Sequence, residues 1–251
     1  MRADQLLVER GLAATRSQAQ RLITSGVQWR SGLQAWQQVL KNGEDLPTAC
    51  ELQLLDDAEI RYVSRGGLKL EGALLQTGLS VKGLVGLDVG QSTGGFTDCL
   101  LQHGARQVWG VDVGHGQLHP RLQTDPRVHV LEKANARHLS AASLGAQGPL
   151  GFDLVVADLS FISLTLVIPA MYGLMKPTAQ ALWLIKPQFE LQAHDLGKGG
   201  LVKDPALYLQ VEQRLRQACE ATGLQVLNWL QSPILGGDGN QEFFIHARRA
   251  A

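Results

Sequence analysis

The chain has 251 residues, of which 45% are hydrophobic and 18% are charged, a composition typical of a globular protein with one large domain or a large domain and a small companion. It has no run of about 18 apolar residues, which argues against a membrane-spanning helix, and its three distant cysteines form no Cys-x-x-Cys site or disulfide framework, which fits a reducing cytoplasm. Lys plus Arg equals Asp plus Glu at 23 each, whereas proteins that bind nucleic acids usually carry a basic excess.

The first sixty residues predict a small α+β domain. A helix pattern covers residues 4–11, and a second helix begins after the N-cap residue Thr15 and ends at Gly26. Three short strand patterns follow, separated by turn residues: Val27–Arg30, Gln37–Leu40 and Glu51–Leu55. We therefore predict a domain over residues 1–60 and a linker over residues 61–68, which contains Gly66 and Gly67.

From residue 69 to residue 251, helix and strand patterns alternate. The predicted helices are 69–78, 94–103, 165–175 and 205–222, and the predicted strands are 84–89, 107–113, 128–132, 152–158, 181–186, 224–230 and 242–247. Repeated βα units indicate an α/β domain with a doubly wound, mostly parallel sheet of seven strands. Ligands of such sheets bind at the carboxyl ends of the strands.

The segment from Leu84 to Asp98, LVGLDVGQSTGGFTD, is the most informative in the chain. An apolar strand ends near Asp88 and runs into a glycine-rich turn that opens a helix, so that backbone can approach a ligand closely. The spacing fits neither the dinucleotide fingerprint nor the P-loop. An acidic residue at this strand end instead suits a ligand with a cationic, amino-bearing portion.

Two further strand ends complete a candidate cofactor site. Asp112 ends the second strand, where a carboxylate accepts both hydroxyls of a ribose, and Asn135 follows the third, as a partner for an adenine edge. This order resembles the S-adenosylmethionine site of class I methyltransferases with a Rossmann-like fold. The candidate cofactor residues are Asp88, Gly90, Ser92, Thr93, Gly94, Gly95, Phe96, Asp112, Asn135 and Asp158.

The fourth strand indicates which acceptor is methylated. It ends Asp158-Leu-Ser-Phe-Ile-Ser, without the Asn/Asp-Pro-Pro-aromatic motif of enzymes that methylate base amines and without the nearby cysteine that base-carbon methylation needs. A ribose hydroxyl must lose its proton as it attacks the methyl group, and a lysine accepts that proton only where its surroundings favour the neutral amine. Lys69 precedes the first strand, Lys186 ends the fifth and Glu242 begins the last.

The set Lys69, Asp158, Lys186 and Glu242 resembles the catalytic tetrad of FtsJ-like ribose 2′-O-methyltransferases. The segments SRGGLK, DVGQSTGGFTD, DLSFIS, KPQFE and GKGG, in this order over almost the whole chain, resemble the TlyA family, whose members are known as haemolysins and as ribosomal RNA methyltransferases. The resemblance implies S-adenosylmethionine-dependent 2′-O-methylation of cytidine in ribosomal RNA. It also implies an amino-terminal alpha-L RNA-binding fold like that of ribosomal protein S-four.

On this hypothesis the ribose hydroxyl lies between Lys186 and Glu242. Asp158 orients Lys186, and Lys69 raises the local positive potential so that Lys186 serves as the base or as an electrostatic clamp. Substitution of Lys186 is expected to abolish methyl transfer while cofactor binding persists.

The zero net charge is an average over segregated blocks. Residues 1–41 hold six basic and two acidic residues, residues 42–60 hold six acidic residues and no basic one, and residues 61–82 hold four basic and one acidic. Local RNA contact is therefore compatible with a neutral chain. The candidate RNA-binding residues are Arg2, Arg10, Arg16, Arg21, Arg61 and Arg65.

Alternatives to a ribosomal RNA methyltransferase stay open at the level of sequence. They are a membrane-active haemolysin, a non-catalytic RNA-binding ribosome-assembly factor, and a methyltransferase that acts on a small molecule. His115 and His119 have a spacing seen in metal sites, but no adjacent glutamate or third ligand accompanies them, so no metal is predicted.

Overall fold

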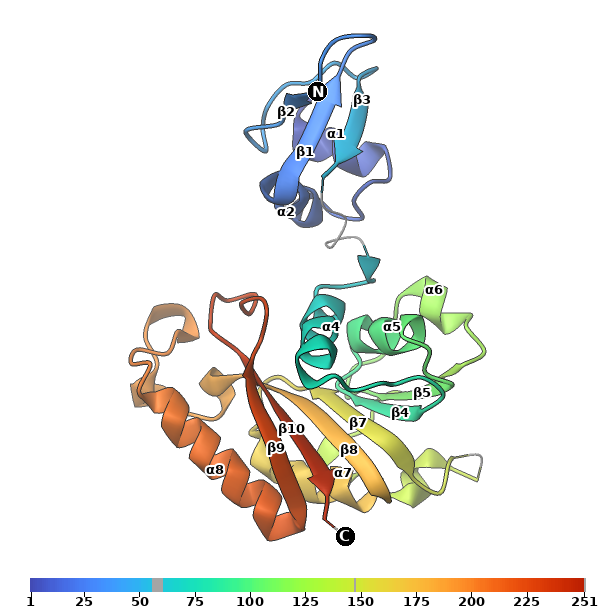
Figure 1. The fold of residues 1–251 in the computed structure, drawn as a ribbon, viewed down its shortest axis with the longest axis vertical. Helices are drawn as coiled ribbons and strands as arrows, with labels where there is room; N and C mark the ends of the chain where they lie inside the picture. Colours follow the sequence, from blue (N-terminus) through green and yellow to red (C-terminus); the bar gives the residue numbers. More distant parts are fainter. Residues whose placement is uncertain (56–60, 147, 251) are drawn as a thin grey trace. The chain divides into compact units, whose positions relative to one another are not determined.

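The computed structural model of the chain describes residues 1–55, 61–146 and 148–250. It divides into two compact units, Met1–Arg65 and Gly66–Ala251, and each is described by itself (Figure 1).

The amino-terminal unit packs two helices against a small antiparallel sheet. Helix α1 (Ala3–Glu9) and helix α2 (Arg16–Gly26) precede strands β1 (Val27–Arg30), β2 (Gln37–Gln38) and β3 (Glu51–Leu54), which pair in the order β2-β1-β3. The Thr15 hydroxyl accepts a hydrogen bond from Gln18 N at 3.2 Å and caps α2. The apolar faces of both helices meet the sheet in a core that includes Leu6, Leu7, Leu22 and Val27.

The second unit is built on a twisted sheet with strand order β6-β5-β4-β7-β8-β10-β9 in the described residues. Strands β4 (Val85–Val89), β5 (Gln107–Val111), β6 (Val128–Leu131), β7 (Phe152–Asp158) and β8 (Met175–Ile185) are parallel, and β10 (Phe243–Arg249) runs antiparallel between β8 and β9 (Leu224–Gln231). Every residue of β4 is buried, as expected for a central strand covered on both faces.

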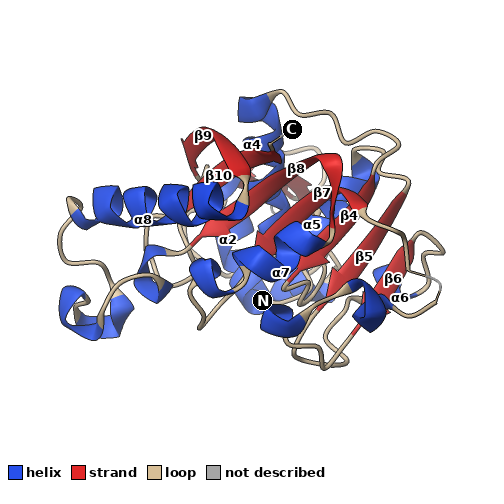
Figure 2. Cartoon of the chain, turned by 90° about the horizontal axis from the view of Figure 1, so that it is seen from below, coloured by secondary structure: helices blue, strands red, loops and turns tan. Residues whose placement is uncertain are grey.

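Helices cover both faces of this sheet (Figures 1 and 2). Helix α4 (Gly66–Thr77) packs against α5 (Gly95–Gln102), while α7 (Ile168–Gly173) packs against α8 (Leu207–Thr222); the short helix α6 (Pro120–Gln123) follows β5. A large apolar core with Leu87, Phe152, Trp183 and Leu215 fills the layers. The predicted α/β architecture with a mostly parallel sheet of seven strands is confirmed.

Some boundaries differ from the sequence prediction. Helix α4 begins at Gly66, inside the segment 61–68 that is predicted to be a linker. Its first turn is helical because Gly67 is buried on the same face as Leu70 and Leu74. The helix expected over 165–175 is a 3₁₀ turn followed by α7, which ends at Gly173. Strand β8 starts six residues earlier than expected because Met175 pairs with Phe152 at the start of β7.

Two results from the described part of the chain bear on the alternatives. None of its helices is both long enough and apolar enough to cross a membrane. Nor do its His, Cys, Asp and Glu side chains form a group of three or more that could hold a metal ion. His119 has a local structural contact, since its Nδ1 accepts a hydrogen bond from Arg121 N at 3.2 Å at the start of α6.

Candidate active site

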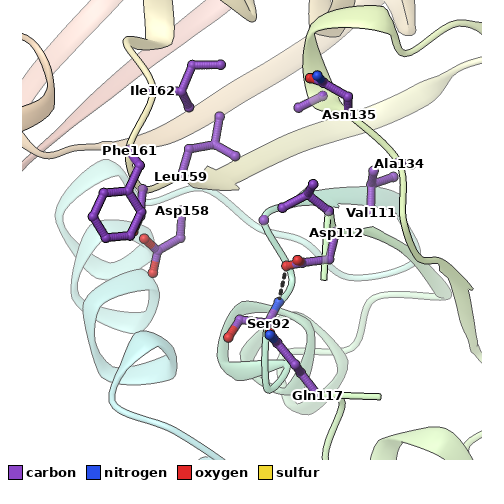
Figure 3. Close-up of a pocket in the computed structure, with 14 residues that line it drawn as sticks. Ser92, Val111, Asp112, Gln117, Ala134, Asn135, Asp158, Leu159, Phe161 and Ile162 are labelled. Atoms are coloured by element: carbon purple, nitrogen blue, oxygen red, sulfur yellow. Dashed lines mark hydrogen bonds between the residues drawn. The ribbon is translucent and has the colours of Figure 1, made fainter. Parts of the chain in front are cut away.

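A cavity of about 470 Å³ opens at the carboxyl ends of β4, β5 and β7. The strand order reverses at this point, because β5 lies on one side of β4 and β7 on the other, so the loops that follow β4 and β7 diverge and leave a crevice. Asp112 and Asp158 lie on opposite sides of the cavity (Figure 3). Its lining residues are Gly90, Ser92, Val111, Asp112, Val113, Gln117, Ala134, Asn135, Ala136, Asp158, Leu159, Ser160, Phe161 and Ile162.

Backbone donors hold the Asp112 carboxylate in place. Ser92 N donates to Oδ2 and Gly114 N donates to Oδ1, both at 2.7 Å. Ser92 reaches this position with a φ of 48°, a left-handed conformation rare for a non-glycine residue. Each carboxylate oxygen has a second lone pair, so Asp112 can still accept hydrogen bonds from the two hydroxyls of a ribose.

Two glycines of the turn serve different purposes. Gly90 has a φ of +85°, and a Cβ there would lie 2.5 Å from the Asp158 carbonyl oxygen, so only glycine lets the turn approach β7 this closely. Gly94 has a φ of +95°, and its Cβ would lie 2.3 Å from Leu122 Cδ1. Gly90 therefore shapes the cavity, whereas Gly94 allows the start of α5 to pack against the segment around α6.

Asp88 lies beneath the turn and is 1% exposed. The Thr97 hydroxyl donates to Oδ2 at 2.7 Å, while Oδ1 is buried and finds no hydrogen-bond partner among the described residues. Burial raises the pKa of Asp88 to about 7. The Thr97 hydrogen bond acts in the opposite direction, and repulsion from Asp158 adds to the rise. An unpartnered buried carboxyl oxygen beside a ligand cavity is suited to a cationic group.

The remaining predicted cofactor residues separate into two groups. Asn135 lines the cavity, and its side-chain oxygen accepts a hydrogen bond from Arg137 N at 3.0 Å, which fixes its orientation. Five predicted cofactor residues do not line the cavity: Asp88, Thr93, Gly94, Gly95 and Phe96. Phe96 is buried and stacks on Phe244, with ring centroids 6.1 Å apart, so its contacts are those of a core residue.

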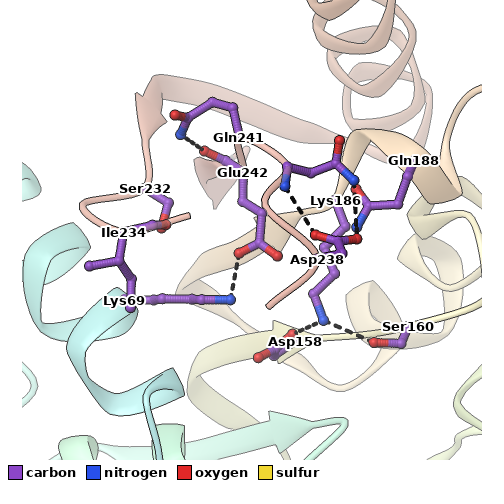
Figure 4. Close-up of polar contacts among 11 residues, drawn as sticks. Lys69, Asp158, Ser160, Lys186, Gln188, Ser232, Ile234, Asp238, Gln241 and Glu242 are labelled. Carbon is purple, nitrogen blue, oxygen red and sulfur yellow. Dashed lines mark hydrogen bonds and ion pairs between the residues drawn. The ribbon is translucent and has the colours of Figure 1, made fainter. Parts of the chain in front are cut away.

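The predicted tetrad is arranged as two ion pairs (Figure 4). Lys69 Nζ lies 2.5 Å from Glu242 Oε2, with both side chains at least nine-tenths buried. Lys186 Nζ lies 2.5 Å from Asp158 Oδ1 and donates a hydrogen bond to Ser160 Oγ at 2.9 Å. Burial raises the pKa of Glu242, with attraction to Lys69 and then to Lys186 acting in the opposite direction.

Strand register explains why residues so distant in sequence meet. Phe243 pairs with Ile185 across the antiparallel strands, so Glu242, which precedes Phe243, lies beside Lys186, which follows Ile185. Asp158 pairs with Leu184 on the other side of β8. Lys69 reaches the same point from the first turn of α4. Asp158 is shared by both parts of the site, because it lines the cavity and pairs with Lys186.

Comparisons with known proteins agree with this geometry. The sequence profile described as "FtsJ-like methyltransferase" matches residues 62–249. The "16S/23S rRNA (cytidine-2'-O)-methyltransferase TlyA" of Mycobacterium tuberculosis is 42% identical over 247 residues, which cover 98% of this chain and 89% of that protein. The chain belongs to the TlyA family of FtsJ-like methyltransferases.

Two further relatives of this FtsJ-like methyltransferase carry a different name. "Hemolysin A" of Brachyspira hyodysenteriae is 35% identical over 246 residues, 98% of this chain and 99% of that protein. A solved structure described as "Putative hemolysin from Streptococcus thermophilus" matches with a TM-score of 0.75 and 37% identity, and covers 100% of this chain and 88% of that one. The family thus includes members named for RNA methylation and members named for haemolysis.

The cofactor of FtsJ-like methyltransferases, S-adenosylmethionine, fits the residues of the cavity. The free lone pairs of Asp112 suit its ribose hydroxyls, and the side chains of Val111 and Ala134 give apolar walls for its adenine. Asp88 does not line the cavity, but it precedes the lining residue Gly90 by two positions, and its unpartnered Oδ1 suits the amino group. The predicted cofactor is therefore confirmed at the level of the family and is consistent with this cavity.

Sequence reasoning did not select two residues of this FtsJ-like site. Ser160 accepts the hydrogen bond from Lys186, and its position two residues after Asp158 was the only available signal. Phe161 lines the cavity although it is 90% exposed, has a φ of +64°, and contacts the Phe189 ring with centroids 5.0 Å apart. No periodicity or spacing signals an exposed phenylalanine in a left-handed conformation.

The predicted RNA-binding arginines of the amino-terminal unit donate hydrogen bonds to other residues of that unit. Arg2 donates two hydrogen bonds to Asp4, and Arg16 donates one at 3.0 Å; Asp4 is fully buried while both arginine side chains remain substantially exposed. Arg10 donates to Thr48 O at 2.6 Å and Arg21 to Ser17 O at 3.2 Å. Arg61 is exposed and Arg65 is half-buried.

Proposed function

We propose that this chain transfers the methyl group of S-adenosylmethionine to the ribose 2′-hydroxyl of a cytidine in ribosomal RNA. The observation that carries the proposal is the shared position of Asp158, which joins the cofactor cavity to the cluster of Lys69, Lys186 and Glu242. The site places a basic group within reach of a cavity that fits a methyl donor. The name of the Mycobacterium tuberculosis relative supports cytidine and ribosomal RNA as the substrate.

In the proposed mechanism, Lys186 reacts as the neutral amine, and its Nζ accepts the proton of the ribose 2′-hydroxyl as the hydroxyl oxygen attacks the methyl group. Asp158 and Ser160 hold that nitrogen at fixed positions, and the ion pair with Lys69 holds Glu242 beside it, where its carboxylate can orient the hydroxyl. The cofactor supplies an electrophilic methyl group when bound. Because the displacement requires in-line geometry, positioning supplies most of the acceleration and general-base help adds on the order of 10²–10⁴-fold.

The expected role of Lys69 changes with this geometry. From the sequence, Lys69 was expected to raise the positive potential around Lys186. Its nearest charged partner in the structure is Glu242, so we propose that it keeps the Glu242 carboxylate ionised and in place. This assignment agrees with the opposing effects of burial and of Lys69 on the pKa of Glu242.

We also propose that the amino-terminal unit is an alpha-L RNA-binding domain that contacts ribosomal RNA in the cytoplasm. Arg2 and Arg10 flank α1, Arg16 and Arg21 lie on α2, and Arg61 and Arg65 follow in the segment that leads to α4. The guanidinium groups can bind phosphates, while the folded shape of the RNA selects the target. The rest of the chain, from Gly66 onward, then provides catalysis.

The experiment that tests the proposal supplies labelled S-adenosylmethionine with unmodified small or large ribosomal subunits and maps ribose methylation. We expect label at a cytidine 2′-hydroxyl, and a Lys186→Ala variant is expected to lose transfer by at least about 100-fold while its affinity for S-adenosylhomocysteine stays within a few-fold. Absence of label from both subunits, or a fully active variant, would contradict the proposal. The haemolysin names of two relatives motivate a parallel assay of liposome leakage, for which we expect no activity.

A further inference from the structure

Glu190 is a buried carboxylate that lies outside the proposed catalytic set. It is 4% exposed and follows Lys186 by four residues, at the end of the 3₁₀ turn Pro187–Phe189 that follows β8. Its Oε1 accepts a hydrogen bond from Leu164 N at 2.6 Å, and its Oε2 accepts one from Ser163 Oγ at 2.7 Å. Arg214 of α8 forms an ion pair with Oε2 at 2.7 Å and also contacts the Glu190 carbonyl.

These contacts join the two loops that carry the proposed chemistry. Leu164 and Ser163 end the loop after β7, which begins with Asp158 and includes Ser160 and Phe161. Glu190 thus connects the far end of the loop after β7 to the end of the 3₁₀ turn after β8, while Lys186 connects the starts of the two segments through Asp158 and Ser160.

A third contact lies between these two connections. The rings of Phe161 and Phe189 are in contact, with centroids 5.0 Å apart. Phe161 holds a left-handed conformation that costs free energy for a phenylalanine, so its position depends on surrounding contacts that fix the loop. On its carboxyl-terminal side, the hydrogen bonds from Ser163 Oγ and Leu164 N to Glu190 hold the loop two and three residues after Phe161.

We infer that Glu190 is a positioning residue, which holds the loops after β7 and β8 in register and so sets the positions of Lys186 and Phe161 at the mouth of the cofactor cavity. Arg214 compensates the buried charge and anchors the pair of loops to α8. The inference rests on the proposed function, because it takes Lys186 as the group that receives the proton. An error of about 1 Å in such a group can lower the rate by about 100-fold.

The test compares Glu190→Gln with a matched variant, Asp153→Asn. Asp153 lies at the opposite end of β7 from Asp158, and like Glu190 it accepts a backbone hydrogen bond, from Val85 N at 2.9 Å, and forms an ion pair, with Lys176 at 2.6 Å. Both variants keep the side-chain shape and remove one buried or half-buried charge. They differ in one respect: only the contacts of Glu190 connect the loops after β7 and β8.

We expect kcat for methylation of ribosomal subunits to fall by about 10-fold to 100-fold in Glu190→Gln, with KM for the subunit and Kd for S-adenosylhomocysteine within about 3-fold of the unmodified protein. In Asp153→Asn, kcat is expected to stay within about 2-fold of the unmodified protein, even where thermal stability falls as much as in Glu190→Gln. A kcat within 2-fold in folded Glu190→Gln, or equal losses in both variants, would overturn the inference.

Ser163→Ala keeps the inference testable if Glu190→Gln does not fold. It removes one donor to Glu190 and is expected to lower kcat by a smaller factor, without a change in KM. An unchanged kcat in Ser163→Ala would then count against the role of Glu190. Failure of the proposed function has a different signature: either the unmodified protein methylates nothing, or Lys186→Ala remains active. A false inference alone leaves the protein active and Lys186→Ala inactive.

Discussion

The buried carboxyl group of Asp88 links the stability of the second unit to pH. Its pKa is raised to about 7 because burial opposes ionisation more strongly than the Thr97 hydrogen bond favours it. The unfolded chain exposes the same group, which then titrates near 3.9. Between these two values the folded state retains a proton that the unfolded state releases, so the free energy of unfolding falls as pH rises from about 4 through about 7.

We therefore expect Asp88→Asn to remove part of this pH dependence. From pH 5 to pH 8 the unmodified protein should lose on the order of 1–3 kcal/mol of stability relative to the variant, because the amide cannot ionise and can still accept the Thr97 hydrogen bond. Urea unfolding at both pH values, followed by tryptophan fluorescence, measures the difference. Parallel pH dependence in the two proteins would show that Asp88 is not the responsible group.

Gly90 provides a second test at the level of one residue. Alanine there would meet the Asp158 carbonyl oxygen at 2.5 Å and must also adopt a φ of +85°, whereas alanine at Gly83, with a φ of +77°, meets nothing within 4 Å. Gly83→Ala is expected to cost about 1–2 kcal/mol of stability and to bind cofactor normally. Gly90→Ala is expected to cost more and to weaken S-adenosylhomocysteine binding by at least about 10-fold, as measured by calorimetry. Equal affinities would mean that the turn does not shape the cofactor cavity.

At the level of elements, Asp4 connects α1 and α2. It lies in the first turn of α1, and accepts hydrogen bonds from Arg16 at 3.0 Å and from Gln20 at 3.2 Å, both on α2. The hydrogen bonds from Arg2, and then those from Arg16 and Gln20, hold the pKa of Asp4 well below its usual range despite burial. Its contribution is therefore complete above the unfolded pKa near 3.9 and is lost as pH falls through the folded value.

Asp4→Asn is expected to loosen these helices at neutral pH. Without the negative charge, Arg2 and Arg16 lose a shared partner, and we expect amide hydrogens of α1 and α2 to exchange at least about 10-fold faster while those of β4 and β7 are unchanged. Glu9→Gln, on the exposed end of α1, is the control and is expected to have no such effect. Hydrogen exchange followed by mass spectrometry reports each element separately. Unchanged exchange in Asp4→Asn would contradict the connecting role.

Sequence patterns predicted which side chains lie close together, because parallel strands carry their carboxyl ends to one edge of the sheet. Asp112, Asp158 and Lys186 each follow or end an apolar strand, so topology alone brings them together. The pairing of Lys69 with Glu242 was not predictable, because it depends on how the first turn of α4 approaches the sheet.

Other features depend on tertiary contacts that leave no pattern in the sequence. Phe161 adopts its left-handed conformation within a loop held by Phe189 and Glu190, and the burial of Asp4 depends on residues up to sixteen positions away. The start of α4 was predicted too late for a related reason: Gly67 is buried on the same face of the helix as Leu70 and Leu74, and glycine has a low helix propensity that gives no signal of a helix start.

At the level of the whole molecule, a neutral chain can bind RNA because its charges are segregated. Residues 1–41 hold six basic residues against two acidic ones, and one of these acids, Asp4, is fully buried against Arg2 and Arg16. Asp4 remains ionised and offsets one of the arginines, so residues 1–41 keep the surplus of four basic residues that the count of charges gives. Each arginine that contacts a phosphate releases counterions when RNA binds, so affinity falls as salt rises.

Replacing both Arg10 and Arg21 with alanine is expected to reduce the steepness of the slope of log affinity against log salt by about 1 for each arginine. The slope is measured with unmodified ribosomal subunits between about 50 and about 200 mM salt, a range in which phosphate contacts weaken strongly. Arg248→Ala is the control, because Arg248 lies near the end of β10 opposite Glu242 and donates to Gln225. Its slope is expected to equal that of the unmodified protein. A double variant with an unchanged slope would remove these arginines from the RNA surface, and an equal loss in Arg248→Ala would mean that the second unit also contributes phosphate contacts.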